Sequence, residues 1–224
     1  MLTTVRCAAL AGFLLTASGA LAQDRPAISL KPTDAPRWDA AMHVGWFSSN
    51  KSEIAPDWND WYDVASYDVS GGFYWTPHLK IELDVARTTT GDIYVEEPPQ
   101  PGVPYYRSRE HRFTTTTVAA GVNYQFFENA WFHPFAGGGL VAIDEHERAG
   151  DAQPTVIFRD AQTPIVLPQP PHIDQTVTSV HPFVTAGFKL YVAERAFLRT
   201  DVRVVAGSGR TEAAVWRGGF GFDF

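Results

Sequence analysis

Apolar and polar side chains alternate along most of the chain after residue 37. Near the C-terminus, Trp216, Phe220 and Phe222 fall on one side of an extended segment, while Arg217 and Asp223 fall on the other. Successive side chains of a β-strand point to opposite faces, so this period of two predicts strands. Eight segments are predicted as strands: 38–46, 67–75, 79–86, 118–127, 132–143, 181–192, 197–207 and 214–224.

The links between these segments alternate between short and long. Short turns are expected at 76–77, 128–130 and 194–195, and long links are expected at 50–62, 91–108 and 149–176. Only the last link on the long side, around 207–209, is short. Short turns at one end and long loops at the other are typical of barrels of the bacterial outer membrane. An even number of strands then places both termini at the short-turn, periplasmic end.

Alternation alone fits two kinds of barrel. A soluble, lipocalin-like carrier turns its apolar face inward, and a transmembrane barrel turns it outward. The polar faces carry five cationic and six acidic side chains, a near balance that a closed interior needs, because an unpaired buried charge is costly. We therefore predict an all-β fold, an eight-stranded antiparallel up-and-down transmembrane β-barrel. Its predicted lumen charge network comprises Lys80, Glu82, Asp84, Lys189, Arg199, Asp201, Arg203 and Arg217, with Asp39, Asp68 and Asp223 as further acids.

The first 22 residues have the pattern of a secretory signal peptide. Arg6 precedes a short apolar run, and the small-x-small site 20–22 ends it, so we expect export through the Sec pathway and cleavage before Gln23. Residues 23–37 are polar and proline-rich and are predicted to be a periplasmic N-terminal segment before the barrel domain, 38–224. Cys7 is the only cysteine, so the predicted mature chain has no disulfide.

Several of these features together resemble a known family. The signal peptide, the eight strands, the short turns and the terminal alternation of Phe220, Phe222 and Phe224 resemble the small outer-membrane β-barrel proteins, the OmpA/OmpX/OmpW-like "porin family". The resemblance covers residues 38–224. It implies that the three phenylalanines are the signal read by the barrel assembly machinery. It does not specify a function, because this fold serves adhesion, anchoring, transport and lipid enzymes.

Our leading hypothesis is a non-enzymatic outer-membrane protein with an envelope-structural or surface-interaction role. The alternatives are a narrow channel for small apolar solutes, a lipid A-modifying barrel enzyme and a soluble lipocalin-like carrier. No histidine precedes a serine by two residues, as the motif of outer-membrane lipid A deacylases requires, and we predict no catalytic residue, metal or cofactor. The net charge of −7 argues against nucleic acid as a partner, and a monomer is expected.

Two charged segments near the outer ends of strands are candidates for binding. Arg107, Arg109 and Arg112 are predicted to contact the phosphates of lipopolysaccharide, since guanidinium groups form forked hydrogen bonds with phosphate. Residues 144–147 (Asp-Glu-His-Glu) have the side chains of a divalent-cation site, but alternation would turn them to opposite faces, and a solvated strand end is the favoured interpretation. We expect membrane lipid and lipopolysaccharide to be the main partners.

Overall fold

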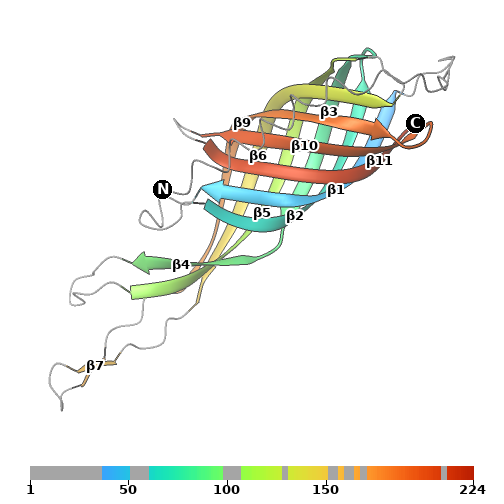
Figure 1. The fold of residues 1–224 in the computed structure, drawn as a ribbon. Coiled ribbons are helices and arrows are strands. Elements are labelled where there is room, and N and C mark those ends of the chain that lie inside the picture. The colour runs from blue at the N-terminus through green and yellow to red at the C-terminus, as the bar shows by residue number, and fades with distance from the viewer. Residues whose placement is uncertain are drawn as a thin grey trace, which may run out of the picture. The chain divides into compact units, whose positions relative to one another are not determined.

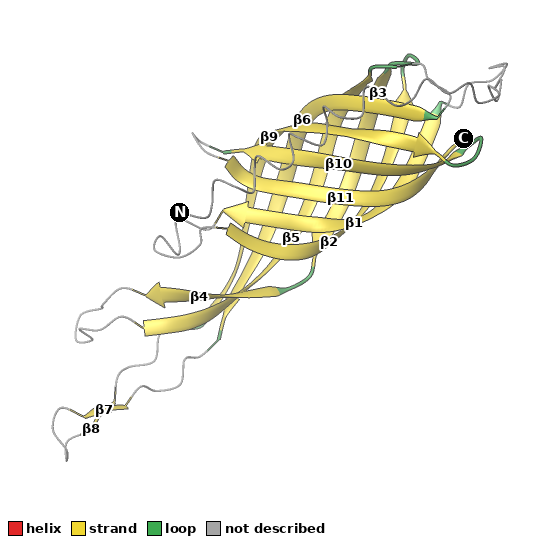
Figure 2. Cartoon of the chain, viewed as in Figure 1, coloured by secondary structure: helices red, strands yellow, loops and turns green. Residues whose placement is uncertain are grey.

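The computed structural model describes residues 37–50, 61–97, 107–127, 131–150, 156–158, 164–166, 171–207 and 211–224. The predicted signal peptide and nearly all of the predicted segment 23–37 lie outside these residues. The described residues form strands and short connections, and none of them belongs to a helix long and apolar enough to cross a membrane (Figure 2). The strands are β1 (Trp38–Asn50), β2 (Trp61–Tyr74), β3 (Leu79–Thr88), β4 (Gly91–Glu97), β5 (Arg107–Gln125), β6 (Phe132–Ala149), β7 (Val156–Phe158), β8 (Pro164–Val166), β9 (Ile173–Tyr191), β10 (Ala196–Ala206) and β11 (Thr211–Asp223).

Eight of these strands close into an antiparallel barrel (Figure 1). Neighbours run in the order β3-β2-β1-β11-β10-β9-β6-β5, and pairing between β3 and β5 closes the ring. The first and last strands meet at a seam where Trp38 and Phe224 exchange both backbone hydrogen bonds, at 3.0 and 2.8 Å. Both strand ends at this seam lie at the short-turn end of the barrel, as predicted.

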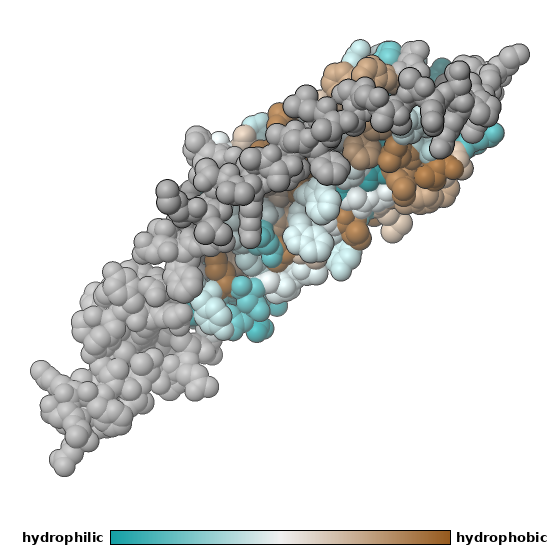
Figure 3. Space-filling view, in the orientation of Figure 1, coloured by the Kyte–Doolittle hydropathy of each residue, from teal (hydrophilic) through white to brown (hydrophobic). Residues whose placement is uncertain are grey.

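The barrel is polar inside and apolar outside. Lys189 is 0% exposed, whereas Met42 is 70% exposed and Val184 is 64% exposed. The space-filling view shows apolar side chains on the outer face of the strands (Figure 3). This arrangement is the reverse of a soluble carrier, so the lipocalin-like alternative was wrong.

Most barrel strands are longer than predicted at the long-loop end, and β2 begins six residues before its predicted start. β5, β6 and β9 extend by several residues past the predicted strand ends, and β4 pairs with β5 beyond the end of β3. Parts of the predicted long links 91–108 and 149–176 are therefore strand. The missed residues are threonine and charged side chains, which also alternate, but without the apolar outer face on which the prediction relied. A separate two-stranded pairing joins β7 and β8.

Candidate functional site: the charged interior of the barrel

The short-turn end of the interior is held together by one aspartate. The Nζ atom of Lys80 donates to Asp39 Oδ2 at 3.0 Å, and Lys189 Nζ also donates to Asp39. Lys189 donates in addition to the hydroxyl of Tyr74 at 2.5 Å. These groups come from β1, β2, β3 and β9, so the cluster crosslinks opposite walls of the barrel.

A second cluster fills the middle of the barrel. The guanidinium of Arg199 forms a forked pair with Glu82, through Nη1 at 2.5 Å and Nη2 at 2.8 Å. Asp201 accepts from Arg199 Nε at 2.9 Å and from Arg217 Nε at 2.8 Å, and Arg217 also pairs with Asp68. Both arginines are 2% exposed. The forked pair of Arg199 with Glu82, out of contact with water, is the strong form of the ion pair, because two parallel N–H···O bonds fix its geometry.

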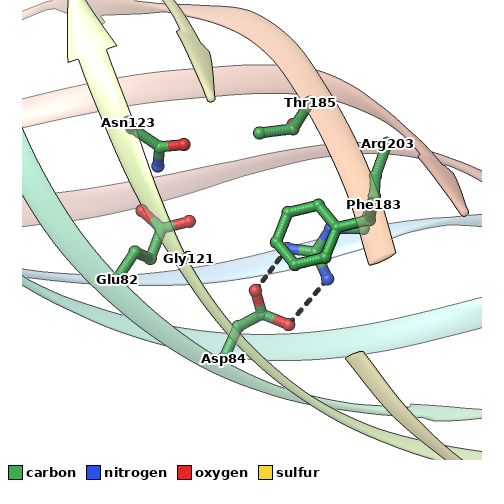
Figure 4. Close-up of a pocket in the computed structure, with 7 residues that line it drawn as sticks. All are labelled: Glu82, Asp84, Gly121, Asn123, Phe183, Thr185 and Arg203. Carbon is green, nitrogen blue, oxygen red and sulfur yellow. Dashed lines mark hydrogen bonds and ion pairs between the residues drawn. The ribbon is translucent and has the colours of Figure 1, made fainter. Parts of the chain in front are cut away.

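The third cluster stands against an aromatic ring. Arg203 forms a forked pair with Asp84, with Nη1 3.0 Å from Oδ1, and its guanidinium carbon lies 4.3 Å from the centre of the Phe183 ring. Figure 4 shows this pair beside the recess that Gly121, Asn123 and other neighbours line. In this described part of the barrel the recess leaves no space wide enough for a water molecule.

One histidine extends the central cluster. His43 Nδ1 lies 2.6 Å from Asp68 Oδ1, and Asp68 also pairs with Arg217. The His43 side chain is fully buried. The structure thus brings all eight predicted lumen residues into one interior, and it adds His43 and Tyr74, which sequence reasoning had not included in the network.

Between the charged clusters and the long loops, the interior contains a layer of apolar side chains. Phe47, Val64, Phe113, Ile143 and Phe183 are among the buried side chains that pack together there. This cluster was not predicted, because we expected every inward face to be polar or small. The sequence does indicate this cluster. At inward positions closer to the long loops, large apolar residues replace the charged residues that occupy the inward positions nearer the short turns.

Arg109 was wrongly predicted to contact lipopolysaccharide. Its side chain points inward and is buried, and its guanidinium donates to the backbone carbonyls of Ala149 at 2.8 Å, Gly150 at 3.1 Å and Pro171 at 2.7 Å. These carbonyls lie at the end of β6, just after it and just before β9, where the buried guanidinium supplies donors to them. Residues 109 and 112 differ in parity, so they could not both face outward.

Arg112 does face outward and is well exposed. Its Nε donates to Glu110 at 2.9 Å and lies 3.3 Å from Asp92, and these two carboxylates raise the pKa of the guanidinium. Arg107 pairs in register with Glu97 on β4. The side chain of Arg107 lies outside the described part of the structure, so its predicted lipid contact remains a prediction.

The four residues 144–147 are divided between the two faces of β6. Asp144 and His146 point outward, where Asp144 accepts from Thr178 at 2.8 Å. Glu147 points inward and lies 2.6 Å from His111 Nδ1. Because the carboxylates do not converge, the residues do not form a common ligand set for a cation.

Two aromatic groups flank the seam at the short-turn end. Phe220, Phe222 and Phe224 all face outward, and the first two rings contact edge to face at 4.7 Å between centroids. Tyr191, in contrast, turns inward, and its hydroxyl donates to Asp223. Its parity is that of Lys189, which explains its direction.

Glycine is needed where strands pack inward without room for a side chain. A Cβ atom at Gly187 would overlap the backbone of Thr200 and the Asp201 side chain, whereas one at Gly218 would meet nothing nearer than 3.9 Å. We expect Gly187→Ala to lower the free energy of unfolding by about 1–3 kcal/mol, as overpacking does. Gly218→Ala, on the outward side, is the matched control and should change this free energy by less than about 0.5 kcal/mol. Urea titrations of both variants would measure this, and equal losses would contradict the packing described.

Comparisons with known proteins agree with this architecture. No protein-family model and no curated protein sequence matches the chain. Among solved structures, the outer membrane protein OprG of Pseudomonas aeruginosa is similar at 12% identity and a TM-score of 0.51, with 85% of this chain and 97% of that chain covered. Neisserial surface protein A (NspA) is similar at 13% identity and a TM-score of 0.51, with 84% and 97% covered. This chain therefore has the predicted fold, that of the small eight-stranded outer-membrane β-barrel proteins.

Proposed function

We propose that the chain is a non-enzymatic protein of the outer membrane, with an envelope-structural or surface-interaction role. One observation carries this proposal: ion pairs fill the interior of the barrel, and the strands turn apolar side chains outward. A barrel of eight strands is only wide enough for its own side chains. Such a barrel suits an anchor that holds the strands β5, β6 and β9 above the membrane.

The height of the apolar belt supports a membrane location. On β9, outward side chains are apolar from Leu190 to Val180, which is roughly ten residues and, at a tilt of about 40°, a height of about 25 Å. This height matches the apolar band of outer-membrane barrels. In this location the short turns and both termini would be periplasmic, after Sec export and removal of residues 1–22.

The proposed partners follow from the same location. The outward phenylalanines of β11 would be read by the barrel assembly machinery, and membrane lipid and lipopolysaccharide would surround a monomeric barrel. The outward row Met42, Val44 and Trp46 on β1 supports this contact, because apolar side chains this exposed gain free energy when lipid covers them.

The channel alternative can be tested by conductance across a planar bilayer. We expect the wild-type chain to produce no conductance steps, because the charged clusters and the apolar cluster close the interior. Removing the pair beside the recess, with Arg203→Ala and Asp84→Ala together, should open a path and produce steps.

Heat-dependent migration on gels would establish that both proteins are folded. Conductance steps from the folded wild-type chain would contradict the proposal and favour a channel.

A further inference from the structure

The outer face of β5, β6 and β9 changes from apolar to polar at one level. The register joins these strands side by side, so outward residues form rows across the three strands. The last apolar row is Val118, Ala142 and Val180, and the next rows are Thr116, Asp144 and Thr178, then Thr114, His146 and Thr176, then Arg112, Arg148 and Asp174. In the proposed location, the hydrocarbon of the membrane ends at the last apolar row, and the polar rows stand in the headgroup and sugar region.

Three arginines lie on this outward face above the apolar rows. Arg87 on β3 is in register with Thr116, at the first polar row, and it is exposed. Arg112 and Arg148 are direct partners across β5 and β6, and their side chains are 59% and 62% exposed. Like charges directly opposite each other on one face of a sheet are unfavourable, so nearby anions stabilise such a pair.

Carboxylates beside the arginines hold them in position without covering them. Arg112 pairs with Glu110 and Asp92, and Arg148 Nε lies 3.4 Å from Asp174 Oδ2. All of these ion pairs engage the Nε atoms of the arginines. In each of these pairs Nε is the nearest nitrogen to the carboxylate. The exposed guanidinium also carries forked Nη donors, which fit the oxygens of a phosphate. A guanidinium that is already ordered loses less conformational entropy when it binds.

We propose that Arg87, Arg112 and Arg148 form a binding surface for the phosphate groups of lipopolysaccharide in the outer leaflet. This inference rests on the proposed outer-membrane function. It replaces the predicted set around Arg109 with three arginines that share the outward face. Arg87 stands at the level where lipid headgroups begin, and Arg112 and Arg148 stand higher, at the level of the sugars that follow.

The test measures binding of the detergent-solubilised full chain to fluorescently labelled lipopolysaccharide by anisotropy. The variant R112Q/R148Q removes the two facing charges, and we expect it to bind about tenfold more weakly than wild type, because a charge-assisted hydrogen bond contributes more than about 1.4 kcal/mol. The control R37Q/R195Q removes two arginines from the short-turn end and should bind within about twofold of wild type. Dephosphorylated lipopolysaccharide should bind to all three proteins equally weakly.

Two outcomes would overturn the inference. One is equal affinity of wild type and R112Q/R148Q, and the other is equal affinity of wild type for intact and dephosphorylated lipopolysaccharide. Insertion of each protein into phospholipid vesicles, followed by heat-dependent migration, separates this failure from failure of the proposed function. If the proteins insert but R112Q/R148Q shows no loss of affinity for lipopolysaccharide, only the arginine surface is contradicted. If the wild-type chain does not insert, both the arginine surface and the proposed outer-membrane function are contradicted.

Discussion

Glu82→Gln is expected to lower the free energy of unfolding by about 3–5 kcal/mol, the cost of leaving a buried charge without its partner. Glu82 is 5% exposed and contacts Lys80 and both Nη atoms of Arg199. The amide keeps the shape of the side chain but removes its charge, so the two cations keep their burial and lose their main acceptor. Urea unfolding of the full chain in phospholipid vesicles, followed by tryptophan fluorescence, would measure the loss.

Two further variants make this result interpretable. Glu194→Gln changes an exposed carboxylate in a short turn and should alter the free energy of unfolding by less than about 0.5 kcal/mol. The double variant Glu82→Gln, Arg199→Gln removes the stranded cation as well and should recover part of the loss. A loss below about 1 kcal/mol for Glu82→Gln alone would mean that water or side-chain movement compensates the charge.

Leu83→Arg is expected to lower the free energy of unfolding in a bilayer by more than about 1 kcal/mol, because a cation on the lipid face costs about 2–4 kcal/mol at the membrane midplane and about 0–1 kcal/mol near the interfaces. Leu83 is adjacent to Glu82 but points outward, and it is 59% exposed within the apolar belt, one row inside the last apolar row. In a soluble barrel the same substitution would add a harmless surface charge. The measurement is again urea unfolding in vesicles.

The matched control lies on the same outer surface but above the belt. Tyr94 on β4 has a similar exposure and pairs in register with Glu110, beyond the last apolar row. Tyr94→Arg should therefore cost only about 0–1 kcal/mol, the value near the membrane interface. If the two substitutions cost the same, the belt would not face hydrocarbon.

The fold was predictable because parity determines which face each side chain occupies. Once charged residues such as Arg199 and Arg217 are assigned to the inward face, the alternation of side chains and the register between strands determine the inward face of every other strand. The prediction was wrong where parity was not applied. Arg109 and Arg112 were placed in one phosphate site, although a difference of three residues puts them on opposite faces of β5.

The sequence predicted which kinds of residue fill the interior, but not which of them contact each other. Charge balance indicated that the buried ions pair, but pairing Arg203 with Asp84 and Arg217 with Asp68 depends on the stagger between strands, which the sequence does not specify. The apolar cluster with Phe113 and Phe183 was missed for a different reason. Phe113 lies before the predicted strand 118–127, in a stretch whose alternation we did not use. Phe183 lies within the predicted strand 181–192, at an inward position that we expected to be polar or small.

The ion pairs of the lumen also bear on how the barrel forms. Lys189 pairs with Asp39, and Arg217 pairs with Asp68, so each pair joins residues about 150 positions apart. A half-built sheet would therefore expose cations whose partners belong to strands not yet in place, and closing long loops of chain is slow. When the last strand is in place, all of these cations gain their partners together. This favours insertion of the barrel as one cooperative event over stepwise addition of hairpins.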